Sequence, residues 1–160
     1  MENEENPICS NAYDWLVANK PELQKISLCW GDSRIGNVLY KDYKASALLD
    51  WEMANLGDPL MDLAWGFAID ECNSIGLGAP RLKGSMNQSE GIEIWEKRTG
   101  LSAQNIDYFR ILALFKFSVI MVRVAKRLIF NEIRPLDSDF HLNNFTTEYL
   151  NNEVGRVSKL

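Results

Sequence analysis

The stretch Leu28-Cys29-Trp30-Gly31-Asp32-Ser33-Arg34-Ile35-Gly36-Asn37-Val38-Leu39-Tyr40 decides the fold of this chain. Short apolar runs stand on both sides of a polar, glycine-containing segment, a pattern typical of two strands joined by a loop. A polar connection at 41–44 and a further apolar run at 45–49 then predict a third strand, which ends at Asp50. The sequence therefore places three polar side chains, Asp32, Asn37 and Asp50, around one strand–loop–strand unit.

The spacing of these side chains indicates a reaction. Asp32 and Asn37 reproduce the D-x-x-x-x-N part of the kinase catalytic loop H-R-D-x-x-x-x-N. In such loops the Asp receives the proton of the attacking hydroxyl, while the Asn and a later Asp bind magnesium. Arg34 stands where protein kinases often have a lysine that faces the transferred phosphate. Either residue alone fits an ordinary turn, but the combination with Asp50 favours phosphoryl transfer.

Composition argues against several other classes of function, among them nucleic-acid binding and membrane association. The chain has 160 residues, of which 46% are hydrophobic, so one globular domain is the default expectation. The net charge of −5 does not favour nucleic acid or an anionic membrane as partner. The most apolar run, residues 111–122, is interrupted by Lys116 and is shorter than the roughly 20 residues of a membrane span. Three cysteines without a C-x-x-C pair, and an acidic start unlike a signal peptide, favour a reducing, cytoplasmic setting.

Outside the strand unit, apolar residues recur with the 3.6-residue period of helices. We expect helical segments at residues 11–19, 59–67, 87–98, 105–130 and 145–150. Ser10 or Asn11 is the expected cap of the first segment, Asp58 is that of the second, with Pro59 at the first helical position, and Gly100 ends the third. The fourth segment, either one helix or a kinked pair, is apolar almost all round, which predicts the centre of a bundle. The expected fold class is α+β and mainly helical.

Residues 10 to about 130 resemble the C-terminal lobe of the aminoglycoside phosphotransferase and choline kinase superfamily, which is protein-kinase-like. More narrowly, they resemble the branch of predicted phosphotransferases related to the kinase-like domain of some acyl-CoA dehydrogenases. The motifs that carry the resemblance are Trp15-Leu16 with Asn19-Lys20-Pro21, then Trp30 to Asn37, Leu49-Asp50-Trp51-Glu52, Gly57-Asp58-Pro59 and Asp62-Leu63-Ala64-Trp65.

The resemblance implies an ATP- and Mg²⁺-dependent phosphotransferase acting on a hydroxyl of a small molecule, either a metabolite or an antibiotic-like compound. Asp32 would be the catalytic base, and Arg34 would steady phosphate charge. Asn37 and Asp50 would bind the cofactor through its magnesium ion. The partners implied are a nucleotide and the hydroxyl substrate, without nucleic acid or membrane.

Three further positions follow from the resemblance. Asp62 matches the family's structural Asp, which accepts backbone N–H bonds from the catalytic loop; the open alternative is an exposed helix carboxylate. Trp30 occupies the place of a histidine that generally supports the loop, so we expect altered packing there. Glu52 fits either a place near the metal or an exposed one. The only histidine, His141, lies in a polar tail and is expected at the surface.

The expected organisation is a polar segment at 1–9 followed by a kinase-like C-lobe at 10–160. No G-x-G-x-x-G occurs in the sequence, so we expect the N-lobe, which covers the phosphates in kinases, to be absent. The chain would then be either part of a longer enzyme or a non-catalytic lobe that binds a ligand or partner. In an isolated fragment, an apolar surface where the missing N-lobe would dock predicts a homodimer partner in its place, or poor solubility.

Overall fold

The computed structural model describes residues 6–81 and 83–159. The elements, in chain order, are α1 (Pro7–Ala18), β1 (Ser27–Cys29), a 3₁₀ turn η1 (Ile35–Asn37), β2 (Val38–Lys41), β3 (Lys44–Leu48), β4 (Asn55–Gly57), α2 (Leu60–Glu71), a π turn η2 (Cys72–Gly76), α3 (Gln88–Thr99), α4 (Ile106–Phe130) and α5 (Phe145–Val157). The predicted mainly helical α+β class is confirmed.

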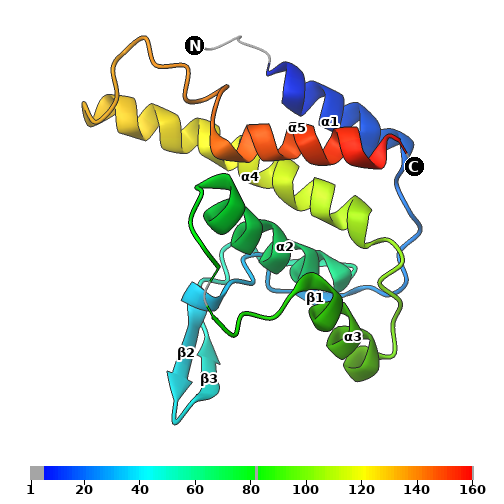
Figure 1. Ribbon diagram of the computed structural model, residues 1–160. Coiled ribbons are helices and arrows are strands. Elements are labelled where there is room, and N and C mark those ends of the chain that lie inside the picture. Colours follow the sequence, from blue (N-terminus) through cyan, green and yellow to red (C-terminus); the bar gives the residue numbers. More distant parts are fainter. Residues whose placement is uncertain (1–5, 82, 160) are drawn as a thin grey trace.

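Helix α4 is the centre of the molecule. It is a single helix of 25 residues, which settles the choice between one helix and a kinked pair. As Figure 1 shows, α1 and α5 lie along one side of it and α2 along the other. Leu114 and Ile111 of α4 are fully buried in the resulting core. This explains the nearly uniform apolar pattern of the segment, because a helix surrounded by others has little surface for polar residues.

The strands form two separate antiparallel pairs instead of one sheet. The β2–β3 hairpin projects from the helices (Figure 1) and turns through Asp42 and Tyr43, both at positive φ. Strand β4 pairs with β1, with Leu56 opposite Leu28. This three-residue strand is absent from the sequence prediction, because so short a segment carries no measurable alternation.

Helix ends follow local chemistry. Gly100 ends α3 as predicted, in a left-handed conformation, whereas Asn87, expected as the first helical residue, caps the helix through a capping box. The predicted cap of α1 is wrong: the side chain of Asn6 caps the helix and Pro7 takes the first position. The helix thus starts inside the expected polar segment 1–9, of which residues 1–5 lie outside the described part.

Helix α5 extends to Val157, well beyond the predicted end at residue 150. Two consecutive asparagines and Gly155 have low helix propensity, but burial of Val154 in the core outweighs it. Among residues 6–81 and 83–159, no helix combines the length and apolarity needed to cross a lipid bilayer.

Candidate active site

The loop between β1 and β2 is held by Asp62 on the first turn of α2. Its carboxylate accepts the backbone N–H of Trp30 at 2.7 Å and that of Gly31 at 2.8 Å. The hydroxyl of Ser33 donates to the main-chain carbonyl of Asp62 at 2.6 Å. The expectation that Asp62 accepts backbone N–H bonds from this loop is confirmed.

Gly31 is required where the loop bends. Its φ of +89° lies in the region that favours glycine, and a Cβ built there would meet the backbone oxygen of Met53 at 2.1 Å. The backbone of the 51–55 connection therefore passes directly against the loop. Any side chain at this position would force the two segments apart.

Asp32 lies at the next position, and three donors surround its carboxylate. The indole N–H of Trp65 donates to Oδ1 at 2.7 Å, whereas Asn37 Nδ2 and Arg34 Nε donate to Oδ2 at 2.6 and 3.0 Å. The Asp32 side chain is 14% exposed. Burial alone would raise the pKa of Asp32, but the hydrogen bonds from Arg34, Trp65 and Asn37, with the charge of Arg34, hold it below its usual value. The carboxylate is therefore ionised at neutral pH.

Asn37 is buried beneath the same carboxylate. Its Nδ2 also donates to the main-chain oxygen of Asp32 at 3.1 Å, so both amide hydrogens are directed at one residue. The amide oxygen is then left as an acceptor on the opposite side of the group. In addition, the N–H of Leu49 donates to the carbonyl of Asn37 at 2.8 Å. This bond ties the end of the loop to the segment that carries Asp50.

Asp50 follows the end of β3, which stops at Leu48 and not at Asp50 as predicted. The residue is exposed and adopts a φ of +59°. Within the described part of the chain, its carboxylate has no hydrogen-bonding or ionic partner. Glu52 is exposed in the turn that follows.

The structure thus brings Asp32, Arg34 and Asn37 into one hydrogen-bonded group and connects Asp50 to it through the backbone of Leu49. Sequence reasoning gave Trp65 no role beyond its place in the motif Asp62-Leu63-Ala64-Trp65. Trp65 is buried, but its indole N–H reaches the carboxylate of Asp32. The signal available was its position three residues after Asp62, which places both side chains on one face of a helix.

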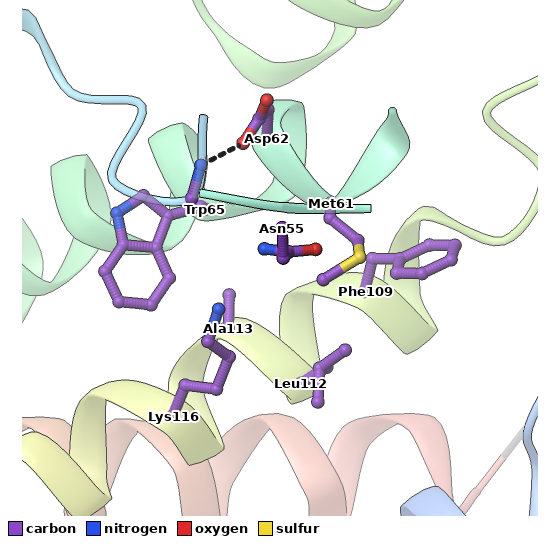
Figure 2. A pocket seen from close by; sticks show the side chains of 9 residues that line it. Asn55, Met61, Asp62, Trp65, Phe109, Leu112, Ala113 and Lys116 are labelled. Atoms are coloured by element: carbon purple, nitrogen blue, oxygen red, sulfur yellow. Dashed lines mark hydrogen bonds between the residues drawn. The ribbon is translucent and has the colours of Figure 1, made fainter. Parts of the chain in front are cut away.

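A small cavity lies behind the loop, between α2, α4 and β4. Figure 2 shows Lys116 and Leu112 of α4 facing Trp65 and Asp62 of α2 across it. The ammonium group of Lys116 stands 5.1 Å from the centre of the Trp65 ring. Burial lowers the pKa of Lys116, and the carboxylate of Asp62 offsets part of that effect. With a volume of about 10 Å³, the cavity has room for a single water molecule and not for a substrate.

Curated relatives share most of this chain but are much longer. Acyl-CoA dehydrogenase family member 11 of Pongo abelii is 28% identical over an alignment 149 residues long, gaps included, which covers 86% of this chain and 19% of that protein. The Gallus gallus protein of the same name is 31% identical over an alignment of length 136, which covers 77% of this chain and 18% of that protein. The chain therefore spans about a fifth of the length of these relatives.

Solved structures share the fold. A predicted aminoglycoside phosphotransferase from Ralstonia eutropha JMP134 superposes with a TM-score of 0.68 and 21% identity, covering 96% of this chain and 48% of that one. A thermostable mutant of aminoglycoside phosphotransferase APH(4)-Ia gives a TM-score of 0.56 at 16% identity and covers 45% of its chain. The match to about half of each structure agrees with a single lobe of that fold.

A family model gives the assignment. The model of the phosphotransferase enzyme family (APH) matches residues 2–87, more than half of the chain. The matched segment contains the loop, both strand pairs and the helix that bears Asp62. The resemblance drawn from the sequence motifs is confirmed, and the chain belongs to the phosphotransferase enzyme family.

Proposed function

We propose that this chain is the catalytic lobe of an ATP- and Mg²⁺-dependent phosphotransferase that acts on a hydroxyl group of a small molecule. The observation that carries the proposal is the set of three donors fixed around the Asp32 carboxylate, on a loop whose backbone is itself held by Asp62. Phosphoryl transfer depends chiefly on positioning and electrostatics, and a loop fixed in this way supplies both.

Asp32 has the role of catalytic base. Its carboxylate is ionised at neutral pH and, with 14% of the side chain exposed, keeps an edge that can accept a hydrogen bond from the substrate hydroxyl. Holding that hydroxyl in line with the phosphate is the main requirement, because a loose transition state needs little proton removal in advance. Arg34 pairs with Asp32 yet is 44% exposed, which leaves its guanidinium able to reach a phosphate oxygen.

Asn37 and Asp50 would hold Mg²⁺. An amide oxygen and a carboxylate are hard ligands, and magnesium is commonly bound by one or two carboxylates together with substrate phosphates. No cluster of three or more His, Cys, Asp or Glu side chains suited to a metal occurs among the residues that the structure describes. This donor set fits an ion that arrives with its nucleotide, where it would neutralise phosphate charge.

Nucleotide binding tests the proposal without knowledge of the acceptor. The melting temperature is measured for this chain, and for the full reading frame that encodes it, with ATP and Mg²⁺, with ATP and EDTA, and with Mg²⁺ alone. We expect a rise with ATP and Mg²⁺ together that is lost in Asp50→Asn and kept in Asp70→Asn, an exposed carboxylate on α2. Absence of the rise in both proteins, or an equal rise in Asp50→Asn, would refute the proposal.

A second candidate function is a non-catalytic lobe that binds a partner. It is favoured by the apolar face of the strands, where Leu28 and Leu56 are 66% and 75% exposed and Tyr43 at the hairpin tip is fully exposed. Surfaces of this kind commonly mark interfaces. ATP binding that depends on Asp50 distinguishes the catalytic from the non-catalytic lobe, because a partner-binding module has no need of the magnesium ligand.

A further inference from the structure

Asp50 adopts a backbone conformation that residues other than glycine rarely take. Its φ of +59° lies in the left-handed region. Residues held in this way persist only when their surroundings determine the conformation, and they concentrate at functional sites. The contacts that fix Asp50 are therefore informative about how the site is built.

Two indole groups hold the backbone immediately before Asp50. The Trp30 N–H donates to the carbonyl of Leu49 at 2.7 Å, and the Trp51 N–H donates to the carbonyl of Leu48 at 2.9 Å. The two rings pack against each other with centroids 6.0 Å apart and planes inclined by 37°. Two consecutive carbonyls are thus fixed by neighbouring side chains.

Trp30 also connects this segment to the loop. Its backbone N–H donates to Asp62, while its side chain reaches Leu49, so one residue joins α2, the loop and the approach to Asp50. Asp32 is two residues further along the same loop. The position of the catalytic carboxylate is in this way linked to the position of Asp50.

Burial alone does not account for the pair. Trp51 is 44% exposed and Trp30 is only partly buried, whereas a tryptophan retained for core packing is mostly enclosed, as Trp65 is. What the two tryptophans share is an indole N–H that donates to a backbone carbonyl of the two residues preceding Asp50. A phenylalanine would keep the ring contact and lose this hydrogen bond.

We propose that Trp30 and Trp51 are positioning residues that hold Asp50 in its left-handed conformation, with its carboxylate presented to the metal. The inference rests on the proposed function, in which Asp50 binds Mg²⁺. It also assigns a role to Trp30, which stands where the family resemblance implies a histidine: the indole N–H supplies the link between the loop and the metal-binding segment.

Mn²⁺ binding followed by electron paramagnetic resonance, with and without ADP, tests the inference without any phosphoryl transfer. We expect Trp30→Phe to weaken Mn²⁺ binding by about 10- to 100-fold, the range for loss of a group that orients a metal ligand. Trp30→His, which restores a ring N–H, should recover part of the loss. Trp51→Phe should also weaken Mn²⁺ binding, and it replaces Trp30→Phe as the test variant if Trp30→Phe does not fold. The matched control is Trp95→Phe on α3, a partly buried tryptophan away from the loop, which should bind as the unmodified chain does.

The outcomes distinguish failure of the positioning role from failure of the metal assignment. If Asp50→Asn abolishes Mn²⁺ binding while Trp30→Phe and Trp51→Phe bind normally, the positioning role is overturned and the metal site stands. If the unmodified chain does not bind Mn²⁺, or Asp50→Asn binds it equally well, the metal assignment fails and the positioning role with it. Equal weakening in Trp95→Phe would mean a general loss of stability, and would overturn the inference as well.

Discussion

Replacing Asp62 by asparagine tests the central support of the site. The carboxylate accepts two backbone N–H groups, from Trp30 and Gly31. An asparagine can keep one of these bonds through its amide oxygen, but its NH₂ group then faces the other N–H. The substitution loses one hydrogen bond to a charged group and leaves a partly buried donor unsatisfied.

The size of the effect follows from these losses. A hydrogen bond to a charged group contributes about 1.5–3 kcal/mol to stability, and Asp62→Asn should lower the free energy of unfolding by roughly that amount. In a chain of this size each kcal/mol shifts the melting temperature by about 2–4 °C, so we expect a fall of about 3–12 °C. Equilibrium urea unfolding followed by tryptophan fluorescence measures the first quantity and calorimetry the second.

Asp70→Asn is the matched control, because it makes the same substitution on the same helix. Asp70 pairs with Arg81 at 2.7 Å, but its side chain is 47% exposed, and exposed ion pairs contribute only about 0–1 kcal/mol. If Asp62→Asn unfolds at the same urea concentration as Asp70→Asn, the loop does not depend on the Asp62 carboxylate and the reasoning is refuted.

Three further predictions concern the loop and the core. Gly31→Ala should destabilise the chain by about 3 kcal/mol or more. Gly100→Ala should cost only about 1 kcal/mol, because a Cβ at Gly100 meets no atom within 4 Å. Equal losses of stability in urea unfolding would contradict the close approach at Gly31. Burial raises the pKa of the Cys72 thiol to about 12. Alkylation of Cys72 in the folded chain should therefore stay slow from pH 7 to 9 and become fast in denaturant. Rapid labelling of Cys72 in the folded chain, detected by mass spectrometry, would contradict this. Glu71→Gln weakens the 2.6 Å ion pair with the buried Arg110 and should lower the free energy of unfolding by roughly 3 kcal/mol, the lower end of the range for breaking a buried pair. An unchanged urea midpoint would contradict this and show that the other acidic side chains around Arg110 suffice to balance its charge.

The parts of the fold that were predictable are those determined by short-range chemistry. The end of α3 was readable because Gly100 is a strong helix-end signal that acts within a few residues. The loop was readable because Asp32 and Asn37 stand at the spacing of the D-x-x-x-x-N part of kinase catalytic loops. For Asp62, the prediction came from the family resemblance, and the hydrogen bonds agree with it.

The missed features depend on contacts between distant segments. Strand β4 exists only because it lies against β1. The last turns of α5 are stabilised by packing and not by propensity, and the hydrogen bond from Trp65 to Asp32 joins residues 33 positions apart. The spacing of Trp65 from Asp62 indicates a shared helix face, but no local pattern identifies Asp32 as the partner of the Trp65 indole.

Asp62 and Trp65 hold the loop from one face of α2, while the buried residues of the same helix pack against α4. The loop therefore cannot open while α2 stays in place. In hydrogen-exchange terms, the amides of Trp30 and Gly31 should exchange at the slow rate set by detachment of α2, unlike those of an ordinary surface loop. The site and the core form one cooperative unit, so a substitution that loosens α2 anywhere along its length will also raise the fraction of molecules in which the site is disassembled.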